Sequence, residues 1–153
     1  MAIVPSVRVQ ADDFNPEAEI KKLTAGRSDV GGVVTFTGYC RDEGGRLEAL
    51  ELEHFPGMAE AEIGRIAQEA ANRWPLTGLS VIHRFGKIRP GEQIVFVAAA
   101  SSHRRAAFEA SDFLMDFLKT RAPFWKKEHL KEGGTGSWVE AKSADDADAA
   151  RWQ

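Results

Sequence analysis

The chain has 153 residues, of which 43% are hydrophobic and 28% are charged, close to the averages of globular proteins. These values predict one domain over residues 1–153 and exclude the disordered and fibrous classes. The net charge of −3 argues against a protein that binds nucleic acid through bulk charge.

The first half of the chain predicts short strands and helices in alternation. Asn15-Pro16 predicts a helix start, because Asn caps helices and Pro suits the first helical position. Residues 31–38 and 47–54 show the β-branched or alternating pattern of strands, with a polar Gly-containing turn between them. We therefore expect these two strands to pair with each other in an antiparallel hairpin.

The second half of the chain continues the same alternation, with helix periodicity before Trp74-Pro75 and before Pro123. The whole chain has the order β-α-β-β-α-β-β-α-β-β, which predicts an α+β domain with helices packed on a mainly antiparallel sheet. The expected elements are strands at 6–10, 31–38, 47–54, 79–85, 93–100, 124–130 and 137–141, helices at 15–25, 58–74 and 103–122, and a short helix in the acidic tail, about 142–153.

Targeting and redox signals are few. No apolar run approaches the roughly 18 residues of a membrane span, and the N-terminus soon turns acidic rather than forming a secretory signal. Cys40 is the only cysteine, which excludes an intrachain disulfide and a multi-cysteine zinc site. We expect a soluble, cytoplasmic protein with no membrane partner and no bound metal.

Positive charge is concentrated in one segment. Residues 101–131 contain seven Lys or Arg side chains against four Asp or Glu, whereas both flanking segments are net acidic. His103, Arg104 and Arg105 fall at a predicted helix N-terminus, where cations are unfavourable but phosphates bind well. This pattern indicates either an anion site or a solvated basic turn.

Two further groups of residues have both a structural and a functional interpretation. Lys119 is favourable at a helix C-terminus, but beside Phe124, Trp125 and Lys126 it could also be a nucleophile or a general acid/base. Arg41 could bind a phosphate or pair with a neighbouring carboxylate. Cys40 is either a reactive thiol beside Arg41 or a small buried hydrophobe.

Several segments together resemble the large, catalytic subunit of molybdopterin synthase, in the same order from about residue 33 to residue 141. The most specific is SSHRRAAFEASDFLMDFLKTRAPFWKKE; the others are VVTFTGYCRDE, LELEHFPGMAEAEI, NRWPL, VIHRFGKIRPGE and WVEA. The resemblance implies an α/β hammerhead-like fold with an additional small antiparallel β subdomain.

The resemblance also implies a reaction. A small ubiquitin-like partner with a C-terminal Gly-Gly carries a thiocarboxylate, and its tail enters a pocket on the large subunit. Sulfur passes to cyclic pyranopterin monophosphate, and two transfers form the dithiolene of molybdopterin. The large subunits are implied to form a homodimer at the centre of a heterotetramer. No cofactor is implied, because the partner supplies the sulfur.

Site residues follow from the matching positions. Lys119 and Lys126 match the two lysines essential for catalysis, whereas His103 and Arg104 match a pair that reaches the pterin phosphate from the other protomer. The remaining substrate-binding positions match Phe36, Tyr39, Cys40, Arg41, Met115, Lys127 and Glu128.

Two other classes of function compete with this one. The chain could be a module that binds the tail of a ubiquitin-like partner without catalysis, although the presence of both lysines argues against it. It could instead bind nucleic acid through residues 101–131, which requires a steep dependence of affinity on salt.

Overall fold

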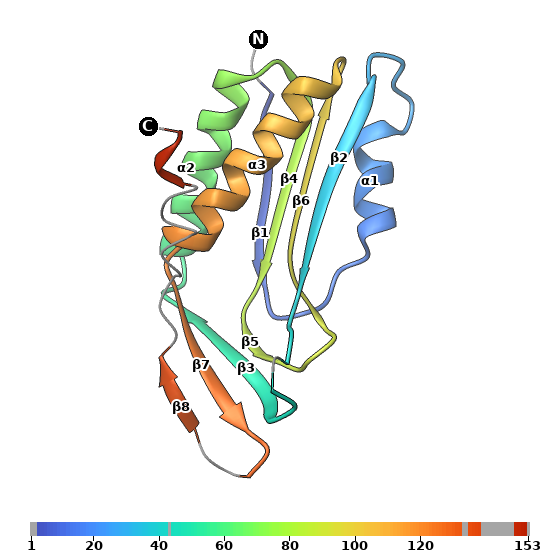
Figure 1. Cartoon of the computed structure of the whole chain (residues 1–153). Coiled ribbons are helices and arrows are strands. Elements are labelled where there is room, and N and C mark those ends of the chain that lie inside the picture. Colours follow the sequence, from blue (N-terminus) through green and yellow to red (C-terminus); the bar gives the residue numbers. More distant parts are fainter. Residues whose placement is uncertain (1–2, 43, 133–134, 139–148, 153) are drawn as a thin grey trace.

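The computed structural model describes residues 3–42, 44–132, 135–138 and 149–152. The described residues form three α-helices and eight β-strands, divided between two four-stranded sheets. The second sheet extends beyond one end of the first, away from the chain termini (Figure 1). The expected α+β fold, with helices on a mainly antiparallel sheet and a small β subdomain, is confirmed.

The first sheet has the strand order β1-β4-β6-β2. β4 (Leu76–Arg84) and β6 (Gln93–Ser101) are its central strands, and both are almost entirely buried. β1 (Ser6–Gln10) pairs with β4 in parallel, whereas β2 (Gly32–Tyr39) pairs with β6 antiparallel. The continuous apolar run of β6 is explained by this position, because a central strand covered on both faces is hydrophobic throughout.

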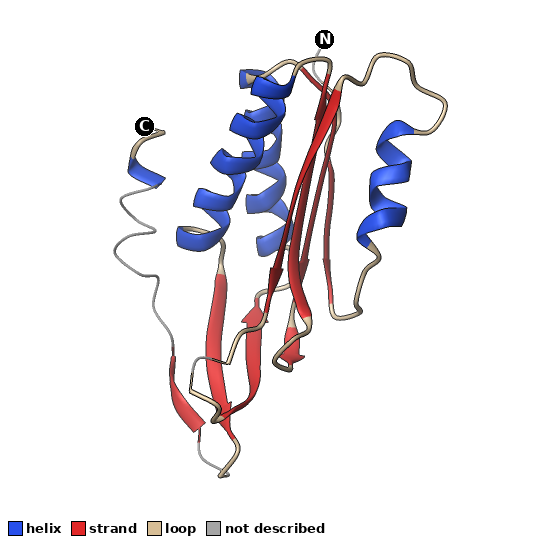
Figure 2. Cartoon of the chain, turned by 45° about the vertical axis from the view of Figure 1, so that its right-hand side comes forward, coloured by secondary structure: helices blue, strands red, loops and turns tan. Residues whose placement is uncertain are grey.

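The helices cover both faces of the first sheet. α2 (Met58–Arg73) and α3 (Arg104–Thr120) pack on one face, and α1 (Pro16–Thr24) packs on the other (Figure 2). The larger core lies under α2 and α3, where residues such as Ile63 and Leu114 are completely buried. α3 is therefore held on the sheet along one side and against α2 along another.

Local sequence signals explain where α1 begins and ends. The Asn15 side chain accepts hydrogen bonds from the backbone N–H groups of Glu17 and Ala18, at 3.0 and 3.3 Å. Gly26 follows the helix with a φ of 71°, in the left-handed region that glycine occupies without strain. Both ends agree with the prediction from sequence.

The second sheet has the order β5-β3-β7-β8 and is wholly antiparallel. β3 (Leu47–His54) lies between β5 (Gly86–Ile88) and β7 (Phe124–Leu130), and β8 (Thr135–Trp138) pairs with β7. Among the described residues, the buried cluster beneath this sheet consists of Cys40, Leu52 and Ile88. Far less apolar surface thus holds the second sheet than the first.

The expected hairpin between residues 31–38 and 47–54 is wrong, because β2 and β3 belong to different sheets. After β2, the chain continues beside the β5–β6 turn: Cys40 N–H donates to the Glu92 carbonyl, and Gly91 N–H donates to the Cys40 carbonyl, both at 2.8 Å. The chain then crosses to the second sheet instead of turning back on β2.

The C-terminal predictions are only partly covered by the described residues. The strand expected at 137–141 begins two residues earlier as β8, and residues 139–141 lie outside the described residues. Most of the helix expected in the acidic tail also lies outside them; Ala149 and Ala150 are helical. Within the described part of the chain, no helix has the length and apolar character needed to cross a membrane.

Candidate active site

Lys119 and Lys126 line one cavity where the two sheets meet, here called the junction pocket. Lys119 lies in the last turn of α3, and Lys126 is the third residue of β7. The short segment between them contains Pro123, which cannot continue the helix, so the chain leaves α3 and returns along the second sheet. Two lysines close in sequence are thereby brought together from different elements.

The other walls of the junction pocket come from both sheets. Tyr39 contributes from the end of β2, His83 from the end of β4, Leu52 from β3 and Met115 from α3. Among the described residues that line it there is no Asp or Glu. A pocket with two ammonium groups and no lining carboxylate is suited to an anion such as a carboxylate or thiocarboxylate.

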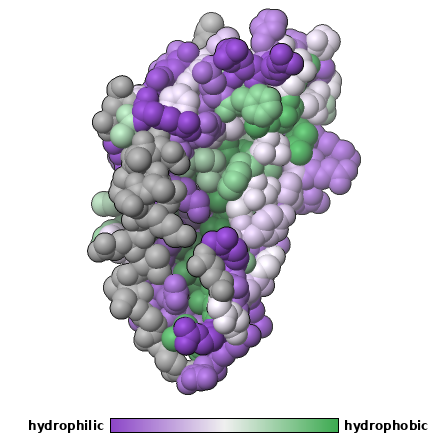
Figure 3. All heavy atoms as spheres, viewed as in Figure 1, coloured by the Kyte–Doolittle hydropathy of each residue, from purple (hydrophilic) through white to green (hydrophobic). Residues whose placement is uncertain are grey.

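A groove along β2 and α3 leads to the same place. Met115 and Lys119 line both this groove and the junction pocket, and Phe36 and Phe108 form apolar walls of the groove. Phe36 is 42% exposed and Phe108 is 59% exposed, and hydrophobic side chains gather on this face of the molecule (Figure 3). Positions 108, 112, 115 and 119 share a helix face because they recur every three or four residues.

His103 and Arg104 lie at the opposite end of α3. They line a separate cavity with Ser102, Arg105 and neighbouring residues, and both are exposed. His103 is the N-cap residue but makes no side-chain capping hydrogen bond, and the first turn contains no acidic residue. At about 1.5 Å of rise per residue, α3 places His103 roughly 24 Å from Lys119. One chain therefore does not bring these groups together.

Strand alternation separates the polar residues of β7. Lys126 pairs with Leu52 and Glu128 pairs with Leu50 in the β3–β7 register, so both face the junction pocket side of the sheet. Lys127 points to the opposite face of the sheet. All three of these β7 side chains are half-buried.

Cys40 and Arg41 follow the end of β2. The Cys40 side chain is 3% exposed and packs with Leu52 and Ile88. Burial raises the pKa of the Cys40 thiol above its ordinary value, so the thiol is less reactive at neutral pH. This environment favours the buried-hydrophobe interpretation of Cys40, whereas Arg41 is exposed.

The sequence pattern favours a structural or solvated histidine at His83, but the structure places this residue in the lining of the junction pocket. Its side chain lies on the same face of β4 as Leu79 and Val81, and it is 5% exposed. The pKa of His83 is lowered to about 4, chiefly by burial and also by the charges of Lys126 and Lys119, against a hydrogen bond to the Arg84 carbonyl that raises it. The imidazole is therefore neutral at pH 7.

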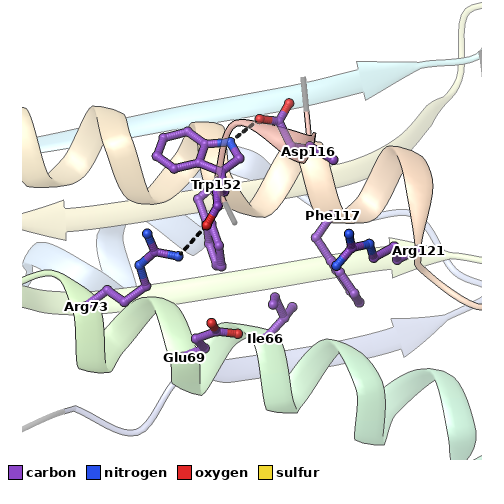
Figure 4. A pocket seen from close by; sticks show the side chains of 9 residues that line it. Ile66, Glu69, Arg73, Asp116, Phe117, Arg121 and Trp152 are labelled. Carbon is purple, nitrogen blue, oxygen red and sulfur yellow. Dashed lines mark hydrogen bonds between the residues drawn. The ribbon is translucent and has the colours of Figure 1, made fainter. Parts of the chain in front are cut away.

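A fourth cavity lies between α2 and α3, away from the junction pocket, and the C-terminal Trp152 packs into it (Figure 4). The indole N–H of Trp152 donates to Asp116, and its ring packs edge-on against Trp74 and Phe113. Arg151 lies 2.6 Å from Asp112 and 3.1 Å from Asp116. The C-terminal residues 151–152 thus bridge the two helices.

Metal-ligating side chains are scattered in the described ranges. Within residues 3–42, 44–132, 135–138 and 149–152, no three His, Cys, Asp or Glu side chains come together in a group that could hold a metal ion. The polar side chains that line the junction pocket are those of Lys119, Lys126, Tyr39 and His83.

Comparison with protein families gives a clear match. The model described as "MoaE protein" matches residues 9–121, which is well over half of the chain. This chain belongs to the MoaE family. The matched range contains both ends of α3, including Lys119, and stops before β7 and Lys126.

Relatives extend the MoaE match over nearly the whole chain. A protein of Mesorhizobium japonicum named molybdopterin synthase catalytic subunit is 68% identical over 99% of this chain and 95% of its own length. The MoaE structure from Burkholderia ambifaria is 45% identical with a TM-score of 0.82, covering 97% of each chain. Molybdopterin synthase from Staphylococcus aureus is 30% identical with a TM-score of 0.76, covering 86% of this chain and 94% of that one. β7 and Lys126 thus lie within the range shared with MoaE relatives.

Proposed function

We propose that this chain is the catalytic subunit of a molybdopterin synthase. It transfers sulfur from the C-terminal thiocarboxylate of a small ubiquitin-like partner to cyclic pyranopterin monophosphate, and two transfers form the dithiolene of molybdopterin. The observation that carries this proposal is the convergence of Lys119 and Lys126 in one pocket of a MoaE family member. The name of the 68% identical relative supports the same activity.

The partner's tail enters the junction pocket along the groove between β2 and α3. Phe36 and Met115 form apolar walls of that path, and Tyr39 stands exposed at its end. A Gly-Gly terminus suits such a path, because it has no side chains to exclude. Lys119 then meets the terminal thiocarboxylate, which carries one negative charge.

The pterin monophosphate binds between two protomers. His103 and Arg104 of one copy hold its phosphate, since within a single chain α3 keeps them roughly 24 Å from Lys119. Arg41, Lys126, Lys127 and Glu128 complete the substrate-binding set, and Cys40 supports the chain beside Arg41. A homodimer with one small subunit at each end gives two complete sites.

Lys119 acts on the thiocarboxylate and in proton transfers at the pterin carbon. Each transfer replaces a carbon–oxygen bond of the pterin side chain with a carbon–sulfur bond, the oxygen leaving as a protonated or phosphate-bound oxygen, and breaks the carbon–sulfur bond of the carrier. An oxygen atom from water replaces the sulfur, so the carrier leaves as a carboxylate. No bound cofactor takes part in this scheme, and neither a membrane nor nucleic acid is a partner. A cytoplasmic location stays a prediction.

The deciding experiment mixes this chain with the thiocarboxylated partner and the cyclic pterin and measures the dithiolene product by mass. We expect two sulfur atoms per pterin and a carboxylate-ended partner. Variants that lack Lys119 or Lys126 are compared with Lys21→Ala, which removes a lysine from α1 on the far face of the first sheet. No product from the intact protein would refute the proposal, and steeply salt-dependent nucleic-acid binding without product would favour the competing function.

A further inference from the structure

His83 links the first sheet, on which the Lys119-bearing helix α3 packs, to the second sheet, which carries Lys126. It lies at the end of β4 in the first sheet, and its ring stacks on Phe124 of the second sheet with centroids 3.9 Å apart and planes 13° apart. Phe124 and Lys126 share one face of β7 because they are two residues apart on a strand. The stacking contact therefore fixes the segment of β7 that carries Lys126.

The hydrogen bonding of His83 fixes its tautomer. Its Nδ1 lies 2.9 Å from the Arg84 carbonyl oxygen. A carbonyl oxygen only accepts, so Nδ1 carries the proton and donates it, and in a neutral ring Nε2 holds the lone pair. The side chain thus presents an uncharged acceptor in a pocket whose two lysines are donors only.

The charges around His83 keep it in this form. Lys126 of β7, Lys119 of α3 and His54 of β3 all disfavour a positive charge on it, and burial acts in the same direction. A carboxylate in its place would also accept from the lysines, but it would cancel the positive charge that attracts an anionic substrate. A neutral acceptor orients the ammonium groups and leaves their charge available.

We propose that His83 is a positioning residue of the junction pocket, which holds Phe124 by stacking and orients the ammonium groups of Lys126 and Lys119 through Nε2. This inference rests on the proposed function, because it assigns His83 a role in the same sulfur transfer. It predicts that one substitution can remove the hydrogen-bond acceptor Nε2 while keeping the aromatic face that stacks on Phe124.

The test is His83→Phe, which keeps an aromatic face for Phe124 and removes Nε2. We expect kcat for dithiolene formation to fall about tenfold, the size of a lost neutral hydrogen bond, with the KM for the thiocarboxylated partner changed less than twofold. The melting temperature should match that of the intact protein. His54→Phe is the matched control, because the His54 ring also packs near Phe124 but does not line the pocket, and it should keep normal kcat.

A second measurement does not depend on turnover. Imidazole ¹⁵N chemical shifts at pH 7 should show a neutral ring with the proton on Nδ1, and Lys126→Gln should raise the titration midpoint of His83. Unchanged kcat in His83→Phe, or a titration midpoint of His83 that stays the same in Lys126→Gln, would overturn this inference. Full activity of Lys126→Gln would instead refute the proposed role of the lysine, so the two failures can be told apart.

Discussion

The two ends of α3 both carry cations, but the helix dipole has opposite effects on them. At the C-terminal end, Lys119 is favoured by the dipole and lies in a pocket with a second lysine. At the N-terminal end, Arg104 and Arg105 are disfavoured by the dipole, and the first turn has no acidic residue to compensate. Cations with a structural benefit say little about function, whereas cations that cost stability point to an anionic ligand.

The largest expected effect is at the C-terminal end. Lys119→Ala should lower dithiolene formation at least about 100-fold, the scale of a lost general acid/base, while binding of the thiocarboxylated partner is largely kept. Product mass and partner affinity are measured on the same preparation. Normal turnover in this variant would show that Lys119 takes no part in the reaction. The contrast between the two ends of α3 would then have no functional meaning.

The next largest effect is the pH dependence of the free energy of unfolding that His83 causes; His83 lines the same pocket as Lys119. Because the pKa of His83 is lowered from 6.5 to about 4 in the folded protein, the unfolded chain takes up a proton at higher pH. The free energy of unfolding should therefore fall as pH drops from about 6.5 towards 4, by about 1–2 kcal/mol between pH 7 and pH 5. Chemical denaturation at both pH values measures this, and His83→Phe should lose that part of the slope.

A smaller effect is expected in the middle of α3, where its carboxylates meet the C-terminal residues. Trp152→Ala removes the packing against Trp74 and Phe113 and the hydrogen bond to Asp116, so we expect a loss of about 1 kcal/mol in the free energy of unfolding. Trp125→Ala, at a more exposed tryptophan, should cost less. Equal losses would mean that Trp152 does not bridge the helices.

The smallest effect has the opposite sign and belongs to the N-terminal end. Arg104→Ala should raise the free energy of unfolding by about 0.3–1 kcal/mol, because a cation leaves the positive end of the dipole. The same variant should raise the KM for the cyclic pterin. Arg105→Ala in the same turn should give a similar gain in stability without the change in KM. A loss of stability in Arg104→Ala would contradict the comparison between the two ends.

Elements with strong local signals could be predicted from the sequence. The Asn15-Pro16 start, the helix end before Trp74-Pro75 and the apolar run of β6 all agree with the structure. Strand partners could not be predicted in the same way, because alternation shows which face of a strand is buried but not which strand lies beside it. The separation of β2 from β3 depends on backbone bonds at Cys40 that leave no mark in the sequence.

The candidate site was predictable to a similar degree. The resemblance supplied Lys119 and Lys126 as a pair, and the structure places both in one pocket. The sequence favours a structural or solvated role for His83 and does not place it in the site, because a histidine on a strand has the same pattern whether it fills the core or lines a site. Its importance depends on Phe124 and on the meeting of the two sheets, which only the tertiary structure reveals.

The unequal anchoring of the two sheets has a consequence for how variants of this protein should be interpreted. Lys119 is attached to the large core, whereas Lys126 is attached to a sheet whose own buried cluster, among the described residues, is Cys40, Leu52 and Ile88, and whose β7 reaches the large core through Phe124. Local opening of that small sheet would expose the amides of β7 to hydrogen exchange while β4 and β6 stay protected. A substitution there can therefore abolish turnover in a protein whose global unfolding transition is normal, and loss of activity must be checked against exchange in β7.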